Sequence, residues 1–305
     1  MARTRKRKVI QETFSDRLFV VLDWMLLLFL LIIVLIPLLN VISCSLSEPT
    51  AVGGGRVFLT PKGFSLTAYQ SLLEEKTIMT GFLNTIFYTV FGTILNLIVT
   101  LSCAYPLSRR ELLFKKPLMF FFSFTMLFSG GMMPTYLLIK SLGLLNSRWV
   151  MIIPGAMSVS NMIIARTFFM NTIPQELTEA AEIDGASDYR LIFSVVLPLS
   201  APIIAVLTLF YAVGHWNAFF SCFLYITKPE LFNLQVVLRN FIANTRALMD
   251  SNGLTESIAA AQDAALFQEV LKYAIIVFTS IPILLIYPFV QKHFVKGVMI
   301  GSLKG

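Results

Sequence analysis

The sequence predicts an all-α integral membrane protein with six transmembrane helices and both termini in the cytoplasm. Hydrophobic residues make up 56% of the 305 residues, and charged residues only 13%. Six stretches of 17 or more residues contain no Asp, Glu, Lys or Arg, and a transmembrane helix needs about 20 mostly apolar residues. The basic residues gather in segments that fall on one side of a six-span layout.

The composition excludes several classes of protein. A soluble domain needs roughly twice this share of charged residues to cover its surface, and the mean hydropathy of +0.77 points the same way. A disordered chain and a coiled coil are excluded on the same grounds. The net charge is +7, from 24 Lys and Arg against 17 Asp and Glu. In a membrane protein this excess indicates cytoplasmic loops, so we expect membrane lipid, and no nucleic acid, as a partner.

The charge-free stretches place the six helices. The stretches are 24–47, 77–108, 117–139, 149–165, 191–227 and 273–291. They predict helices over 20–43, 82–105, 117–138, 149–170, 197–222 and 271–291. The fourth stretch ends at Arg166, whose long side chain can reach the interface. The fifth stretch is too long for one span, so part of it is expected outside the bilayer.

The basic residues set the orientation. Three segments carry clusters of them, namely the first 17 residues, the loop after the second span and the tail after the sixth: Arg3, Arg5, Lys6, Arg7, Lys8, Arg17, Arg109, Arg110, Lys115, Lys116, Lys292, Lys296 and Lys304. Cytoplasmic loops carry the excess of Lys and Arg. The sequence therefore predicts a basic cytoplasmic N-terminus (1–19), a six-helix transmembrane domain (20–291) and a cytoplasmic tail (292–305). The first apolar run is longer than that of a signal peptide, so an uncleaved first helix is favoured.

Three loops are expected on the outer face. Residues 44–78 form a substantial loop, residues 139–148 a short one and residues 223–270 the longest, with a short helix around Ser257–Lys272. A loop this long is more often functional than idle, so partner binding is favoured over a solvated connector. A disulfide between Cys44 and Cys222 is conceivable near this face, but isolated thiols in apolar surroundings are the preferred interpretation.

The cytoplasmic segment 171–196 differs from the other inside loops because it is acidic. Thr172 to Gln175 fits a capping box, and a helix from there should run to about Asp184. Gly185 then suits the left-handed position after a helix, and Ser187 can cap a second short helix that leads into the fifth span. The segment is therefore predicted to form a helix, a glycine turn and a second helix.

The first of these helices carries a surface suited to a protein partner. Leu177, Ala180, Ala181 and Asp184 share one stripe. The alanines permit a close approach, and the surrounding acids can pair with arginines of a partner. The alternative is an amphipathic helix on the lipid surface. Such helices prefer Lys and Arg on their polar face, whereas these acids would be repelled by anionic lipid, so a protein partner is favoured.

This segment resembles the EAA loop of ABC importer permeases. Glu179-Ala180-Ala181 is followed after three residues by Gly185, and after nine more by Val195-Val196-Leu197-Pro198. The family prefers isoleucine at the position of Val195, a mild departure. The resemblance extends over nearly the whole chain and is to the MalG-like permease subunits of carbohydrate importers. The stretches Gly130–Tyr136 and Phe294–Gly301 resemble a subgroup associated with complex oligosaccharides.

The resemblance implies the MetI/MalG-like ABC importer permease fold, in a multi-pass protein of the bacterial plasma (inner) membrane. The chain would pair with a second, different permease subunit and with two copies of a cytoplasmic ATPase. An extracellular solute-binding protein would deliver the carbohydrate, an oligosaccharide. ATP and Mg²⁺ would be bound by the ATPase, and this chain would bind no cofactor or metal itself.

The resemblance also assigns roles to residues of the EAA loop, which would be the coupling helix that docks in a cleft of the ATPase. The coupling residues would be Glu179, Ala180, Ala181, Asp184, Gly185, Leu197 and Pro198. Glu179 would bond a basic ATPase residue, the alanines would permit close packing and Gly185 would make the turn. Leu197 and Pro198 would fix how the loop enters the fifth span. The loop 223–270 would reach toward the solute-binding protein, and the tail Gln291–Gly305 would touch the ATPase dimer.

Polar and aromatic residues in or near the spans form a second candidate site. Pairing of helix to helix is the preferred explanation for them. The alternative is a lining of the translocation path, because aromatic and amide groups suit sugar rings and hydroxyls. The candidates for this path are Tyr211, His215, Trp216, Asn217 and Asn161.

The sequence contains no phosphate-binding GxxxxGK[ST] loop, no HExxH zinc motif and no GxSxG elbow. It therefore predicts a transport subunit without its own ATPase site rather than an enzyme. An ion-coupled secondary transporter subunit is the alternative function. That class commonly carries acids or bases inside its helices, and the charge-free stretches argue against it. A membrane scaffold without transport activity would leave the acidic loop unexplained.

Overall fold

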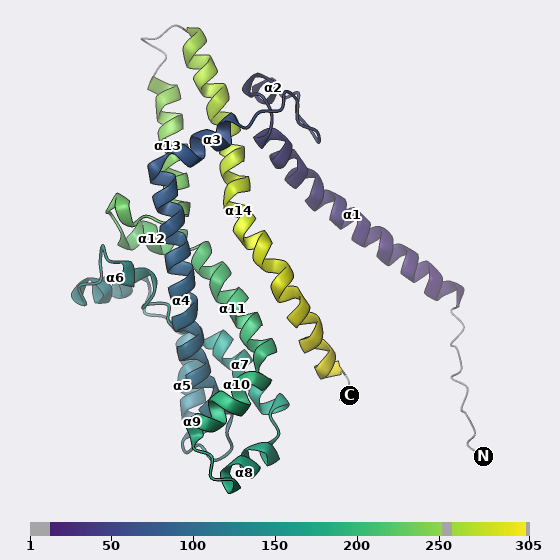
Figure 1. The fold of residues 1–305 in the computed structure, drawn as a ribbon, viewed down its shortest axis with the longest axis vertical. Coiled ribbons are helices and arrows are strands. Elements are labelled where there is room, and N and C mark those ends of the chain that lie inside the picture. Colours follow the sequence, from purple (N-terminus) through teal and green to yellow (C-terminus); the bar gives the residue numbers. More distant parts are fainter. Residues whose placement is uncertain (1–12, 252–257, 303–305) are drawn as a thin grey trace. The chain divides into compact units, whose positions relative to one another are not determined.

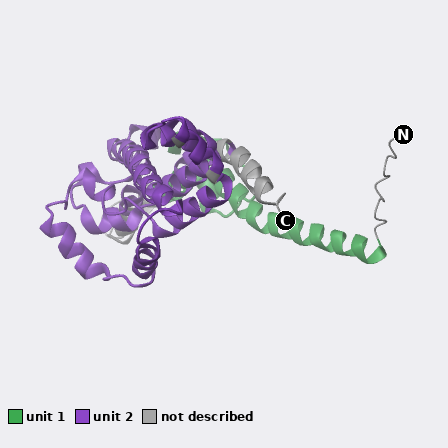
Figure 2. Cartoon of the chain, turned by 90° about the horizontal axis from the view of Figure 1, so that it is seen from below, with its two compact units in different colours: residues 1–69, 252–277 green, residues 70–251, 278–305 purple. Residues whose placement is uncertain are grey.

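The computed structural model describes residues 13–251 and 258–302, and every regular element in these ranges is a helix (Figure 1). The chain divides into two compact units, one made of Met1–Tyr69 and Asn252–Val277 and the other of Gln70–Ser251 and Phe278–Gly305 (Figure 2). The prediction of an all-α protein is confirmed for the described residues.

The first unit contains the long apolar helix α1 (Phe14–Ser45). Its N-terminus is closed by a capping box in which the Thr13 backbone N–H donates to the Asp16 carboxylate at 2.9 Å. Nearly all its large apolar side chains are exposed, as expected of a helix with lipid as solvent. The unit also holds the short helix α2 (Pro49–Gly53), the start of α3 (Thr67–Glu74) and the first part of α14 (Ile258–Ser302).

Helix α4 (Lys76–Ser108) is the central element of the second unit. It packs against α7 (Val159–Thr172), α11 (Ala201–Trp216) and α13 (Leu234–Ser251). One apolar core joins α4, α7, α11 and the segment that precedes α11. Its buried members are Ala104, Leu107, Met162, Ala165, Phe169, Leu191, Val196, Ile203, Leu207 and Tyr211. We call this set the lower core, and it positions the cytoplasmic segment described below.

Three helical stretches among the described residues are long and apolar enough to cross a membrane: Phe14–Ser45, Lys76–Ser108 and Asp263–Ile286. Two further pairs of helices pass the same test only when each pair is taken together, and each pair is sharply bent. Helices α5 (Lys115–Leu127) and α6 (Met132–Ser141) meet at 109°, and the stretch Asp188–Leu199 meets α11 at 79°. Helix α7 has only 14 residues.

The third, fourth and fifth helices were predicted to be continuous, and this prediction was wrong because each is interrupted. Gly131, with φ of 84°, separates α5 from α6. The fourth consists of a 3₁₀ turn (Arg148–Met151), a non-helical stretch around Pro154 and Gly155, and α7. The fifth is divided into α10 (Leu197–Leu199), α11 and α12 (Phe219–Tyr225). Proline lacks the N–H that a helix interior needs, and glycine permits left-handed turns.

The two longest of the loops predicted on the outer face contain more helix than expected. The region 44–78 includes α2, α3 and the beginning of α4, and the region 223–270 includes α13. The short helix expected around Ser257–Lys272 is instead the first part of α14, which continues through the sixth span into the tail. The basic N-terminal residues 3–8 and Lys304 lie outside the described residues. All three cysteines are free thiols, which agrees with the preferred interpretation and not with a disulfide.

Candidate functional site

The acidic segment 171–196 forms helix α8 (Gln175–Ile183), a turn and helix α9 (Asp188–Leu191), as predicted. The capping box expected at Thr172 is wrong, because Thr172 is the last residue of α7. Proline disfavours the helical conformation at the residue before it, so Pro174 keeps Ile173 extended and α7 ends at Thr172. The carbonyl of Pro174 then accepts the N–H of Leu177 at 3.3 Å, which begins the next helix.

The turn between α8 and α9 depends on Gly185, whose φ is 72°. Across it, the Ala186 N–H donates to the Ala181 carbonyl at 2.9 Å, and the Asp184 N–H donates to the Ala180 carbonyl at 3.0 Å. The first of these bonds and the left-handed glycine define a Schellman C-terminus. The Ser187 hydroxyl then accepts the Arg190 N–H at 3.4 Å and caps α9. Both capping roles predicted for this turn are confirmed.

The residues of the predicted stripe on α8 do not share one environment: some face solvent and one packs against the core. Glu179, Ala180 and Asp184 are exposed to solvent. Ala181 is half-buried and packs against the lower core, and Thr178 is only 5% exposed. Helix α8 therefore rests on its own chain through Ala181 and Thr178 and presents an acidic face that includes Ala180 to the outside. Any chain that docks here meets one small side chain rather than two.

Helix α9 connects to the fifth span through unusual backbone. It runs into a π-helical turn, Ile192–Val196, and then into α10, before the 79° bend into α11. Val196 is buried in the lower core, whereas Leu197 is half-buried and Pro198 is exposed. The Ser200 hydroxyl donates to the Val196 carbonyl at 2.6 Å and occupies one acceptor at the bend. A single π-turn often marks a functional site, and this one joins α8 and α9 to a spanning helix.

The loop after α4 lies beside the base of α8. A cavity of about 330 Å³ separates them, and its lining includes Arg109, Arg110 and Glu111 on one side and Pro174, Glu176 and Thr178 on the other. The sequence identified these basic residues only as markers of the cytoplasmic side. The structure adds that they stand opposite the acidic segment.

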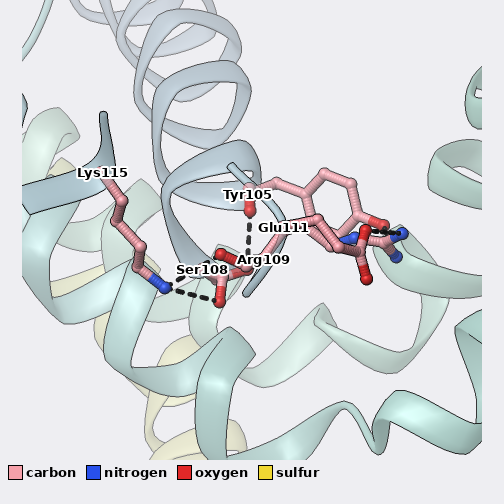
Figure 3. Close-up of polar contacts among 5 residues, drawn as sticks. All are labelled: Tyr105, Ser108, Arg109, Glu111 and Lys115. Atoms are coloured by element: carbon pink, nitrogen blue, oxygen red, sulfur yellow. Dashed lines mark hydrogen bonds and ion pairs between the residues drawn. The ribbon is translucent and has the colours of Figure 1, made fainter. Parts of the chain in front are cut away.

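Cationic side chains cap the C-terminus of α4 (Figure 3). Lys115 donates to the carbonyls of Ser108 and Arg109 at 3.2 and 2.9 Å. Arg109 donates to the Tyr105 hydroxyl at 3.4 Å and pairs with Glu111 at 3.2 Å. Cations near the negative end of a helix dipole are stabilising, so these contacts fix the α4 end against which the acidic segment is placed.

The fourth span contributes a further cap from α7. The Arg166 Nε donates to the carbonyl of Leu107 at 2.9 Å. The sequence predicted only that Arg166 reaches the interface. It could not predict this bond, because spacing along the chain does not show which helix end lies beside Arg166.

The second candidate site is brought together only in part. Tyr211 and His215 both line a cavity of about 400 Å³, together with Asn96, Gly155 and Tyr225 among others. The remaining three candidates are not among its lining residues. Trp216 is buried and donates to the Thr279 carbonyl at 3.1 Å, Asn217 donates to Val213 within its own helix, and the Asn161 backbone N–H donates to the Ser158 hydroxyl at the N-terminus of α7.

Polar contacts between helices surround this cavity. The Tyr211 hydroxyl lies 2.6 Å from Thr100 Oγ1 and accepts the Ser158 N–H at 3.2 Å. The His215 Nε2 lies 2.6 Å from Asn96 Oδ1, and the Asn96 amide donates to the Gly155 carbonyl. These contacts match the helix-pairing explanation, and Asn96, Tyr211 and His215 also line the cavity between α4, α11 and the break before α7.

The segment between α12 and α13 is fastened to α4 at the opposite end of that helix. The Asn84 amide donates to the carbonyls of Glu230 and Phe232 at 2.8 and 3.0 Å. The Tyr88 hydroxyl donates to the Leu231 carbonyl at 2.8 Å. Three hydrogen bonds therefore hold the segment before α13 on α4.

Comparison with known proteins places this arrangement in a family. Residues 17–300 match the sequence profile described as "Binding-protein-dependent transport system inner membrane component". The polygalacturonan/rhamnogalacturonan transport system permease protein YtcP of Bacillus subtilis (strain 168) is 41% identical over 95% of this chain and 100% of its own length. Protein LplC of the same organism is 42% identical over 90% of each chain.

A solved structure agrees with these sequence relatives. A chain from the crystal structure of a bacterial ABC transporter involved in the import of the acidic polysaccharide alginate has a TM-score of 0.82 and 35% sequence identity. The match covers 92% of this chain and 98% of that one. The chain described here therefore belongs to the family of inner-membrane permease components of binding-protein-dependent ABC transport systems.

Proposed function

We propose that the chain is one of two different permease subunits of an ABC importer for oligosaccharides, in the plasma membrane of a bacterium. The observation that carries the proposal is the exposed acidic face of α8, held on the lower core in a chain of the binding-protein-dependent permease family. Two of the relatives are named for polygalacturonan/rhamnogalacturonan and for alginate. Uronic acids are common to these names, so an acidic oligosaccharide is the substrate class we propose.

Six spans with both termini in the cytoplasm are part of the proposal. The three long helices and the two broken pairs account for five spans. The sixth would combine α7 with the 3₁₀ turn Arg148–Met151 before it. The positive-inside rule supports this orientation, and it places α8 and the basic loop Arg109–Lys116 on the same face.

The acidic face of α8 would dock on a cytoplasmic ATPase. Glu179 and Asp184 would pair with basic residues of that subunit, and Ala180 would allow the two surfaces to approach. Ala181 and Gly185 would act within this chain, by seating α8 and by turning the backbone into α9. The movement of α8 would reach α11 through the π-turn, Leu197 and Pro198. ATP and Mg²⁺ would be bound by two copies of the ATPase and not by this chain.

The opposite face would receive substrate from a solute-binding protein. The segment 226–234, fastened to α4 by Asn84 and Tyr88, positions the base of α13 for that contact. The cavity lined by Tyr211 and His215 would form part of the path for the sugar. Family membership supports this importer function, and it lends no support to an ion-coupled secondary transporter.

The test is affinity purification of the tagged chain from its native membrane in mild detergent, with mass spectrometry of the proteins retained. We expect a second permease and an ATPase with the wild-type chain. Glu179→Lys should lose the ATPase but keep the second permease, and Glu74→Lys, the same change at an exposed residue of α3, should keep both. Wild-type recovery of the ATPase with Glu179→Lys would contradict the role of α8.

A further inference from the structure

The loop between α2 and α3 turns back along α1 instead of extending away from it. The Asn40 amide donates to the carbonyls of Val57 and Phe58 at 3.4 and 2.8 Å. The Ser43 hydroxyl donates to the carbonyl of Leu59 at 2.8 Å. Residues 57–59, which we call the loop tip, therefore lie beside residues 40–43 of a helix that continues to Ser45.

The arm that follows the loop tip lies level with the end of α1. The Ser65 N–H donates to the Leu46 carbonyl at 3.0 Å, and the Glu48 N–H donates to the Lys62 carbonyl at 3.1 Å. Since an α-helix rises 1.5 Å per residue, the five residues from Asn40 to Ser45 place the tip about 7 Å deeper than the helix end. The loop thus dips along the helix and returns.

Glycines in the left-handed conformation stand at both ends of this dip. Gly55 has φ of 63° and Gly63 has φ of 64°. A Cβ added to Gly63 would lie 2.8 Å from Oε2 and 2.9 Å from Cβ of the Glu48 side chain, so that position also leaves little room for a side chain. The reversal is therefore built into the sequence by turn residues and by the side chains of Asn40 and Ser43.

The dip presents apolar side chains to its surroundings. Val57 is buried, but Phe58 is 62% exposed and Phe64 is 69% exposed. Leu59 is 42% exposed, at the level of Ile42, which is itself 44% exposed on the apolar surface of α1. The tip thus continues the surface that α1 presents to lipid, and an aromatic side chain at that depth would be costly in water.

Two cations flank the apolar tip along the chain. Arg56 and Lys62 are both exposed, and the Lys62 backbone is level with the end of α1, where lipid phosphates would lie. Cationic side chains at an interface favour anionic headgroups while their apolar neighbours enter the acyl boundary. This order of residues, cation, apolar tip and cation, fits a phospholipid surface better than an aqueous partner.

We propose that the loop 55–64 is a membrane anchor that inserts Phe58 into the outer leaflet, with Arg56 and Lys62 at the phosphates. The occupant of this surface is phospholipid. The anchor fixes the outer end of α1 and the loop that follows it, and neither the family description nor transport itself requires it. Its test is therefore independent of substrate and of ATP.

The experiment uses the assembled transporter in lipid nanodiscs, with Cys44, Cys103 and Cys222 replaced by Ala. A nitroxide is attached at Phe58→Cys, Phe64→Cys or Thr67→Cys, and its collisions with oxygen and with a water-soluble nickel chelate are measured. We expect position 58 to collide mainly with oxygen and position 67 mainly with nickel, with position 64 between them. Thr67 is the aqueous control, because it follows the Ser65 that pairs with the helix end.

Two results at position 58 would overturn the proposal. Strong collision with nickel would place the tip in water, and weak collision with both reagents would mean that protein covers it. Phe58→Trp provides a conservative second variant that keeps an aromatic ring. Its added fluorescence should be quenched by brominated lipid in the same nanodiscs, and unquenched emission at the wavelength of exposed indole would contradict insertion.

Discussion

The Ala186 N–H and the Ala181 carbonyl meet at 2.9 Å across Gly185, and this bond closes α8 at the point where α8 rests on the lower core. Ala181 serves both purposes, because its carbonyl accepts the closing bond and its side chain packs on the core. The turn and this packing together set the orientation of the exposed face of α8 relative to α9 and α11. A change in this turn should alter transmission to the spans without removing the acidic face.

Gly185→Val should uncouple ATP hydrolysis from transport. A side chain in the left-handed conformation costs about 1–2 kcal/mol, and more when it is β-branched. Among the described residues beyond its two chain neighbours, no heavy atom lies within 4 Å of a Cβ built at Gly185, so strain rather than a clash causes the loss. Binding-protein stimulation of the ATPase, measured in proteoliposomes, should fall several-fold.

Two matched variants isolate that strain. Gly185→Asn should retain most of the stimulation, because asparagine tolerates the left-handed region. Gly143→Val introduces the same strain at a glycine with φ of 68° and equally open surroundings, but outside the acidic segment, so it should lower stability and leave coupling intact. Equal stimulation in Gly185→Val and the wild type would refute the assignment.

The contact between Tyr211 and Thr100 should be measurable as a coupling free energy. Tyr211→Phe removes the hydroxyl that lies 2.6 Å from Thr100 Oγ1 and accepts the Ser158 N–H. Leaving a buried donor without its partner costs about 1–3 kcal/mol, whereas hydrogen bonds between membrane helices average about 0.6 kcal/mol. We therefore expect Tyr211→Phe to lower the free energy of unfolding by about 0.6 to 3 kcal/mol. Thermal unfolding of the purified complex measures this loss.

A double-mutant cycle with Thr100→Val separates the pair from its surroundings. The double variant should be less destabilised than the sum of the single variants, because the second change removes a group that has already lost its partner. Strict additivity would mean that the two hydroxyls do not interact in the membrane.

Lys115→Met should destabilise the cytoplasmic end of α4. The ammonium group donates to the Ser108 and Arg109 carbonyls, and hydrogen bonds from a charged donor contribute about 1.5–3 kcal/mol. The same substitution at the exposed neighbour Lys116 removes an equal charge without these bonds. A lower melting temperature for the first variant alone would identify the helix cap, and equal shifts would assign the effect to net charge.

Asn84→Leu should release the base of the outer loop from α4. Its amide donates to the Glu230 and Phe232 carbonyls, each bond contributing about 0.5–1.5 kcal/mol. Hydrogen exchange of the backbone amides from Leu231 to Val237 should accelerate by about tenfold or more, since 1.4 kcal/mol corresponds to tenfold. Exchange in α8 and α9 provides the internal control, and unchanged protection at Leu231–Val237 would argue against this fastening.

The sequence alone predicted the class of protein and the local form of the acidic segment. The charge-free stretches located the apolar helices because lipid excludes charge over a fixed length. Gly185 and Ser187 predicted the turn because their conformational and hydrogen-bonding preferences act within a few residues. The sequence placed Pro174 inside a capping box that begins at Thr172. Thr172 instead ends α7, and Pro174 lies in the break before α8.

Only the tertiary structure decided which residues meet. At the break after Pro154 the Asn96 amide of α4 donates to the Gly155 carbonyl, and at the bend before α11 the Ser200 hydroxyl donates to the Val196 carbonyl. Such bonds satisfy backbone groups that a helix break frees. Arg166 caps the carbonyl of Leu107, and Asn40 binds the backbone of Phe58, although each pair is far apart in sequence. Ala181 packs on the lower core, whereas its neighbour Ala180 faces away from it. Local propensity carries no information about such pairs, because packing and the satisfaction of buried polar groups select them after the helices have formed.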